Sequence, residues 1–136
     1  FLEYIYRMAP EDIAPGAKEL ITSLKNDGKK IALASSSKNA RTVIQQLGIH
    51  DLFEAVVDGN MITHTRPDPE IFLLSAKLIH ASPSECVVIE DAKAGVEAAL
   101  RAGMKCIGIG SKDQLYNAHQ VVPTIAHLNN HLPETV

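Results

Sequence analysis

The sequence lacks the features that mark several specialised classes of protein. Its 136 residues carry a formal net charge of -3, so there is no basic excess to favour a nucleic-acid partner. No apolar run approaches the roughly 20 residues that span a bilayer, so we expect no membrane partner. Cysteine is scarce, and both Cys86 and Cys106 lie in or beside apolar runs. We interpret them as buried free thiols of a cytoplasmic protein, with a disulfide pair as the alternative.

Apolar periodicity predicts strands and helices that alternate along most of the chain. Helices are expected over residues 17–27, 40–47, 69–80, 94–102 and 124–131, and strands over 30–34, 53–57, 86–90, 105–109 and 121–122. The spacing suits βα units. The sequence therefore predicts an α/β fold, a Rossmann-like parallel sheet with helices on both faces.

The first 16 residues do not follow this alternation. Residues 1–9 carry Leu2, Tyr4, Ile5 and Tyr6 at roughly helical spacing, which predicts the end of a helix. Residues 10–16, with two prolines and a glycine, predict a hinge before a core over 17–136. Since residue 1 is not methionine, we expect the chain to begin inside a longer unit.

Two adjacent carboxylates, Glu90 and Asp91, directly follow the apolar run 87–89. Ligands of open α/β sheets bind outside the carboxyl ends of the strands. Two acids there repel each other unless a cation joins them, and a hard cation such as Mg²⁺ prefers oxygen ligands. The alternative is that Asp91 caps the following helix, which explains Asp91 but leaves Glu90 unexplained.

Two further polar clusters fall at predicted strand ends. Ser35–Asn39 follows one strand and opens a helix, so its hydroxyls and its lysine could hold a phosphate, or the serines could only cap the turn. Arg66 precedes Pro67 in a loop before a helix, where it could face an anion or lie solvated at the surface. A hydroxyl, a cation and a carboxylate pair together suit a phosphoryl group with Mg²⁺.

Three stretches carry a resemblance to a known family. They are residues 31–39 (IALASSSKN), 66–72 (RPDPEIF) and 89–95 (IEDAKAG), in that order. With them the chain resembles the haloacid dehalogenase-like (HAD-like) superfamily, in its β-phosphoglucomutase branch. The resemblance implies a HAD-like core in which Glu90 and Asp91 hold Mg²⁺, Ser35 and Arg66 serve catalysis, and the phosphorylated substrate contacts Ser35, Ser36, Ser37, Lys38, Asn39 and Arg66.

Two departures from the family pattern matter. The family usually has lysine where this chain has Arg66, and arginine is planar and forked rather than a point charge. The family nucleophile is an aspartate in an Asp-x-Asp motif after a central strand, and no two aspartates here are one residue apart. We therefore expect a sheet that lacks its first central strand. Such a chain would fold poorly alone, or a missing N-terminal segment or a swapped copy would fill the gap.

Three functions remain open from the sequence. The first is a Mg²⁺-dependent phosphomutase that interconverts β-glucose 1-phosphate and glucose 6-phosphate through an aspartyl-phosphate. The second is a related phosphatase that acts on a small phosphorylated sugar. The third is an inactive fragment or pseudoenzyme, which Arg66 and the absent Asp-x-Asp motif favour.

Overall fold

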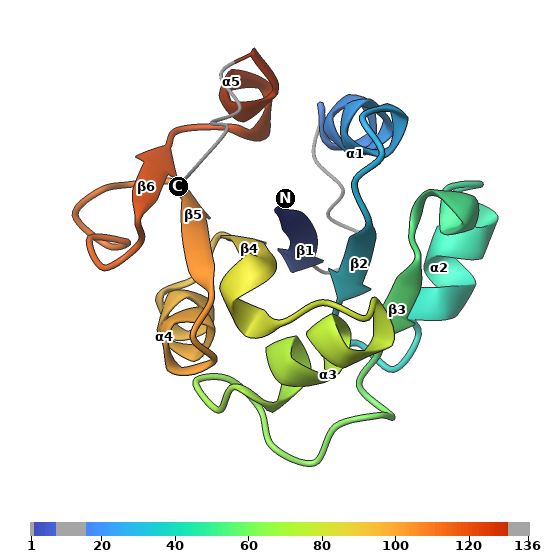
Figure 1. Cartoon of the computed structure of the whole chain (residues 1–136), viewed down its shortest axis with the longest axis horizontal. Coiled ribbons are helices and arrows are strands. Elements are labelled where there is room, and N and C mark those ends of the chain that lie inside the picture. Colours follow the sequence, from blue (N-terminus) through green and yellow to red (C-terminus); the bar gives the residue numbers. More distant parts are fainter. Residues whose placement is uncertain (1, 8–15, 131–136) are drawn as a thin grey trace.

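The computed structural model describes residues 2–7 and 16–130 and contains one six-stranded parallel sheet. The sheet order is β3-β2-β1-β4-β5-β6, with β1 at the centre (Figure 1). The strands are β1 (Glu3–Arg7), β2 (Ile31–Ala34), β3 (Ala55–Val57), β4 (Cys86–Glu90), β5 (Lys105–Ile109) and β6 (Gln120–Val122). The helices are α1 (Ala17–Asn26), α2 (Ala40–Gln46), α3 (Glu70–Leu78), α4 (Lys93–Arg101) and α5 (Ile125–Asn130), with 3₁₀ turns at His50–Leu52 and Pro83–Glu85.

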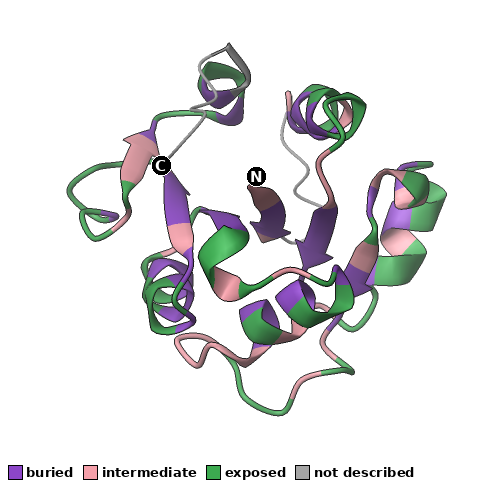
Figure 2. Cartoon of the chain, in the orientation of Figure 1, coloured by how far each residue is buried: buried purple, intermediate pink, exposed green. Residues whose placement is uncertain are grey.

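The α/β fold with helices on both faces is confirmed. Alternate residues of each central strand enter two apolar clusters on opposite faces of the sheet. In β1, Tyr4 and Tyr6 pack on the face that carries α1 and α5, while Ile5 packs on the face of α3 and α4. Figure 2 shows the consequence, with buried strands enclosed by helices whose outer surfaces are exposed. No helix among the described residues is long and apolar enough to cross a bilayer.

The predicted helix at the amino end is wrong over Glu3–Arg7, which form β1. The apolar run of Tyr4, Ile5 and Tyr6 is the short, continuous type found in strands buried on both faces, and aromatic and β-branched residues favour strands. Residues 10–15 of the predicted hinge lie outside the described residues, so the division into a cap end, a hinge and a core stays a prediction.

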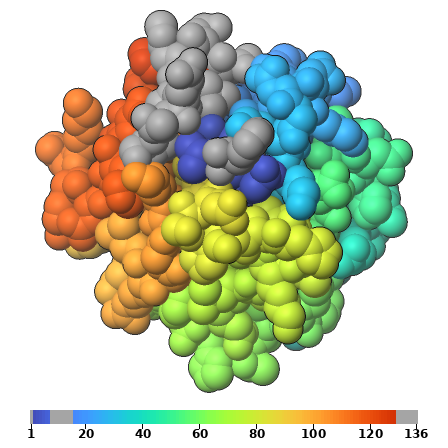
Figure 3. Space-filling model, viewed as in Figure 1, coloured from blue at the N-terminus to red at the C-terminus, as the bar shows by residue number. Residues whose placement is uncertain are grey.

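The expected vacancy in the middle of the sheet is also absent, because β1 fills it. Tyr4 pairs with Ile31 of β2 on one side and with Val87 of β4 on the other. Both neighbours thereby complete their backbone hydrogen bonds without a second polypeptide. In the space-filling view, dark-blue atoms of this N-terminal segment lie in the middle of the face, among later parts of the chain (Figure 3).

Candidate functional site

The candidate site lies at the carboxyl edge of the sheet, where β1, β2 and β4 end together. Arg7 is the last residue of β1 and pairs in register with Ala34, directly before Ser35. Tyr6 pairs with Ile89, directly before Glu90. Parallel pairing therefore assembles at one edge residues that are more than 80 positions apart in the sequence.

Glu90 is the centre of this edge and is fully buried. Its Oε1 accepts hydrogen bonds from the backbone N–H groups of Asp91 and Ala92, both at 3.0 Å. Arg7 Nε donates to Oε1 at 2.9 Å and to Oε2 at 3.0 Å. Burial raises the pKa of Glu90 to about 7, although the cations Arg7 and Arg66 pull that pKa down.

Gly95 makes room for the buried carboxylate beneath α4. An ideal Cβ at residue 95 would overlap the carboxyl group of Glu90 and lie 2.5 Å from its Cγ. Only glycine lets the helix pass this close to the Glu90 side chain. Gly95 belongs to the site for this steric reason; the sequence analysis included it in the stretch 89–95 but assigned it no role.

Two arginines surround the carboxylate pair. Arg7 Nη2 contacts both Glu90 Oε1, at 2.7 Å, and Asp91 Oδ1. Arg66 Nη1 lies 3.5 Å from Glu90 Oε1, and it is buried without a hydrogen-bond partner among the described residues. Burial lowers the pKa of Arg66, while Glu90 raises it. The cluster of Arg7, Arg66, Glu90 and Asp91, hereafter the four-residue cluster, brings together two basic and two acidic side chains.

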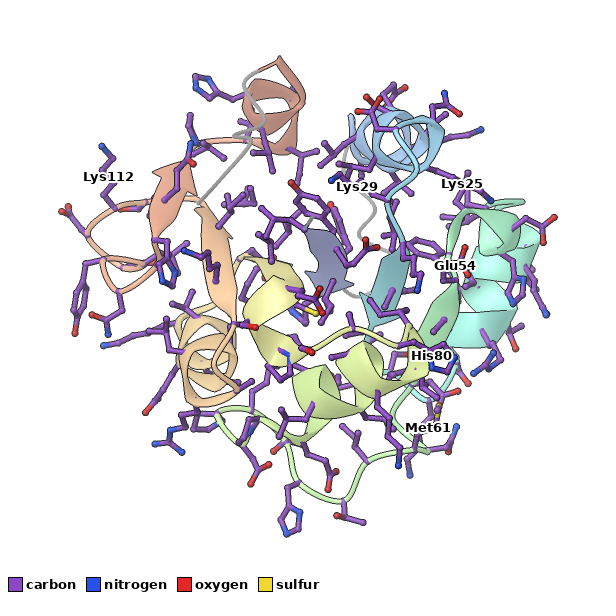
Figure 4. All side chains as sticks on the ribbon, in the orientation of Figure 1. Lys25, Lys29, Glu54, Met61, His80 and Lys112 are labelled. Carbon is purple, nitrogen blue, oxygen red and sulfur yellow. The ribbon has the colours of Figure 1, made fainter. Side chains whose placement is uncertain are left out.

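Two lysines, Lys25 and Lys112, extend away from this edge. Figure 4 shows Lys25 and Lys112 pointing outward at the rim of the molecule, far from β1 in the middle. Lys25 donates to the backbone oxygen of Asp51, at the far side of β3. The cations that act on the pKa of Glu90 are Arg7 and Arg66.

The serine-rich loop after β2 is held as a compact turn. Ser35 is 1% exposed, its N–H donates to the Val57 oxygen at 2.9 Å, and its Oγ accepts from the Ser37 N–H at 3.1 Å. Ser37 Oγ accepts in turn from the Asn39 N–H at 3.2 Å. These hydrogen bonds lie within the turn, and α2 itself has no side-chain cap hydrogen bond at its N-cap Asn39. The sheet register sets Ser35 next to the pair of Ala34 and Arg7.

The other predicted substrate contacts lie on the surface of this loop. Ser36, Lys38 and Asn39 are exposed, and Ser37 is half-buried. Gly59 underlies them, since an ideal Cβ there would overlap the Ser36 carbonyl oxygen. The structure brings Arg66, Glu90 and Asp91 together and sets the serine loop at the adjacent strand end.

The carboxylate pair does not fit Mg²⁺ in this arrangement. Arg7 already donates to both carboxylate oxygens of Glu90 and contacts Asp91 Oδ1. Among the described residues, no group of three or more His, Cys, Asp or Glu side chains is placed to hold a metal ion. The Mg²⁺ assignment of Glu90 and Asp91 therefore stays a prediction, and no chemical step is assigned to the ion here.

Arg7 is the functional candidate that the sequence reading missed. The prediction of a helix over residues that include Glu3–Arg7 concealed that Arg7 ends a central strand, as Glu90 does. A reading of Tyr4–Tyr6 as a buried strand would have placed Arg7 at the same edge as the carboxylates.

Comparisons with known proteins agree with this architecture. The model of the haloacid dehalogenase-like hydrolases matches residues 2–103. The β-phosphoglucomutase of Bacillus subtilis is 43% identical over 118 residues, which cover 87% of this chain and 52% of that protein. The phosphorylated carbohydrates phosphatase of Thermotoga maritima is 37% identical over 95 residues, which cover 68% of this chain and 44% of that protein.

A solved structure also matches this fold. The crystal structure of β-phosphoglucomutase from Clostridium difficile has a TM-score of 0.81 and 40% sequence identity, and the match covers 89% of this chain and 54% of that one. The chain thus spans about half the length of these three relatives. By the family match, the identity and the fold, the chain belongs to the haloacid dehalogenase-like hydrolases, in their β-phosphoglucomutase branch.

Proposed function

We propose that this chain is the phosphate-recognising part of an enzyme that transfers a phosphoryl group on a phosphorylated sugar. The specific reaction proposed is that of β-phosphoglucomutase, which converts β-glucose 1-phosphate into glucose 6-phosphate. Support comes from the 43% identity to the Bacillus subtilis β-phosphoglucomutase over most of this chain. The proposal assigns substrate binding to this chain and leaves the covalent step to a nucleophile that its sequence does not contain.

The observation that carries the proposal is a buried nitrogen of Arg66 that makes no hydrogen bond. Its Nη1 is buried without a hydrogen-bond partner among the described residues, at the edge where β1 and β4 end. Its ion pair with Glu90 Oε1, at 3.5 Å, supplies no hydrogen bond. A buried donor without a hydrogen bond is costly, and an anionic oxygen would satisfy it. A phosphoryl oxygen beside Arg66 would supply that partner.

Ser35 provides the second proposed contact to the phosphoryl group. Its Oγ accepts from Ser37 N–H, and a hydroxyl can donate its own proton as well. Because the Ser35 backbone is fixed to β3 through Val57, the hydroxyl is held in place before substrate arrives. Ser36, Lys38 and Asn39 would contact the sugar from the exposed side of the loop.

The direct test uses a chimera with the Bacillus subtilis β-phosphoglucomutase. The carboxyl-terminal part of that enzyme is replaced by this chain, and conversion of β-glucose 1-phosphate is measured with bisphosphate as primer. We expect turnover by the chimera, none by the 136-residue chain alone, and a loss of at least about tenfold in kcat/KM on Arg66→Ala. The matched control is Arg101→Ala, which removes an exposed arginine paired with Glu97.

A sugar-phosphate phosphatase is the second candidate. The 37% identity to the phosphorylated carbohydrates phosphatase of Thermotoga maritima favours it. Release of inorganic phosphate by the chimera, without formation of glucose 6-phosphate, would replace the mutase assignment by this one. A folded chimera that supports neither reaction would contradict both and favour the inactive fragment.

A further inference from the structure

We propose that Glu70 is a positioning residue for Arg66, because its carboxylate holds the loop that presents the Arg66 guanidinium at the carboxyl edge of the sheet. The proposal deepens the proposed function and rests on it for the anion that Arg66 would meet. Its test measures the position of Arg66 and the binding of inorganic phosphate separately, so the two proposals can fail separately.

Glu70 begins α3 and is fixed to the core by the residues that follow it. Ile71 and Phe72 are buried in the apolar cluster on the α3 face of the sheet. The backbone N–H of Glu70 donates to Asp68 Oδ1 at 2.9 Å. The Glu70 carboxylate therefore extends from a backbone that the core already anchors.

The carboxylate closes the preceding loop onto this anchor. Glu70 Oε1 accepts from the backbone N–H groups of Thr63 and His64, the latter at 3.1 Å. Its Oε2 accepts from Thr63 Oγ1 at 2.9 Å and lies 3.3 Å from His64 Nδ1. The backbone N–H groups of His64 and Thr63 lower the pKa of Glu70 to about 2, so the carboxylate is ionised at neutral pH. Hydrogen bonds to an ionised acceptor are stronger than neutral ones, and they tie residues 63–64 to the start of α3.

Arg66 lies inside the segment that this contact closes. Residues 63–65 are exposed, so burial does not hold them in place. The Asp68 N–H donates to the Thr65 oxygen at 3.0 Å, which turns the chain around Arg66 and Pro67. A loop that is tied at both ends leaves the backbone between them little freedom.

The Arg66 side chain depends on this backbone for its direction. Its Nη1 makes no hydrogen bond among the described residues and lies 3.5 Å from Glu90 Oε1. No hydrogen bond therefore fixes this end of the guanidinium, and the loop decides where it points. A misplacement of about 1 Å by a distant change can cost on the order of a hundredfold in rate, so the contact made by Glu70 matters for the site.

The first measurement follows the Arg66 side-chain N–H signal of the whole chain by NMR without ligand. Glu70→Ala removes the contacts of the carboxylate, whereas Glu70→Gln keeps an oxygen that can accept from both backbone N–H groups. We expect Glu70→Ala to shift the Arg66 signal, and Glu70→Gln to restore most of the parent behaviour. The matched control is Glu85→Ala, since Glu85 Oε1 accepts from the Ser82 N–H at 2.9 Å in the turn before β4. This control should leave the Arg66 signal in place.

The second measurement titrates the same proteins and Arg66→Ala with inorganic phosphate, followed by phosphorus NMR. We expect Arg66→Ala and Glu70→Ala each to weaken phosphate binding at least about fivefold, while Glu85→Ala binds as the parent does. In the Arg66→Ala background, Glu70→Ala should have no further effect, because the carboxylate acts through the arginine. A further loss in that background would show a general structural effect and overturn the positioning role.

Thr63→Val keeps the proposal testable if Glu70→Ala does not fold, because it removes the hydroxyl that donates to Oε2. It should shift the Arg66 signal in the same direction by a smaller amount. An unmoved Arg66 signal in a folded Glu70→Ala, or in Thr63→Val where Glu70→Ala does not fold, would overturn the proposal. So would weaker phosphate binding by Arg66→Ala together with parent-like binding by Glu70→Ala. Parent-like phosphate binding by Arg66→Ala, with the Arg66 signal shifted in Glu70→Ala, would support the positioning role and contradict the proposed function alone.

Discussion

Substitution of Gly95 by alanine should destabilise the protein although alanine is the better helix former. In an exposed helix interior this change stabilises by about 1 kcal/mol. Here the new Cβ would overlap the Glu90 carboxyl group, which is fully buried. The carboxylate would have to leave its donors Arg7, Asp91 and Ala92. Overpacking costs about 1–3 kcal/mol, and a lost hydrogen bond to a charged group about 1.5–3 kcal/mol.

The net expectation is a loss of about 2–4 kcal/mol from the free energy of unfolding, a large share of the roughly 5–15 kcal/mol of a typical domain. Urea denaturation followed by circular dichroism measures it, since the chain has no tryptophan. A double-mutant cycle isolates the cause. In a Glu90→Ala background the overlap is gone, so Gly95→Ala should be neutral or stabilising by up to about 1 kcal/mol. The same loss in both backgrounds would refute the steric reasoning.

Three further predictions concern other parts of the chain. Gly59→Ala should shift the serine loop and weaken binding of a phosphorylated sugar measured by calorimetry, because a Cβ would overlap the Ser36 carbonyl oxygen; unchanged affinity would contradict this. Hydrogen bonds from the loop before α3 lower the pKa of Glu70 to about 2. Its carboxylate should therefore stabilise the fold above pH 4.5, and the stability difference between the parent and Glu70→Gln should vanish as the pH falls towards about 2 in urea titrations. Burial raises the thiol pKa to about 11 for Cys86 and about 12 for Cys106, so a thiol reagent should label both only after unfolding; rapid labelling of the native protein would argue against their burial.

Most of the α/β alternation could be predicted because each element carries its own local pattern. Residues 86–90 and 105–109 were expected as strands, and β4 and β5 have those bounds. The helix faces of α1 and α4 repeat apolar residues at helical spacing and end before Gly28 and Gly103. Such signals need no knowledge of the tertiary fold.

The amino-terminal strand could not be assigned so easily. A run as short as residues 2–6 fits a helical repeat and a buried strand equally well, and length cannot decide between them. The absence of an Asp-x-Asp motif then supported the expectation of an unfilled sheet. The pairing of Tyr4 with both Ile31 and Val87, which decides the matter, depends on contacts across the whole chain.

The sequence predicted several residues of the candidate site but not how these residues are arranged. Glu90, Asp91 and Arg66 were singled out because polar residues at strand ends gather at one edge of a parallel sheet. The contacts that hold the two carboxylates depend on Arg7, which is 83 residues from Glu90 in the sequence. The close passage of α4 over Glu90 at Gly95 is likewise a property of packing rather than of any motif.

The position of β1 at the centre of the sheet is the central claim, because it places Arg7 against Glu90. Amide hydrogen exchange, resolved by residue, tests it most directly. The amides of Tyr4, Ile5 and Tyr6 should exchange as slowly as those of Val88 in β4, because both strands are paired on both sides. Exchange of residues 4–6 at the rate of an exposed segment, with Val88 still protected, would show that β1 does not fill the centre of the sheet.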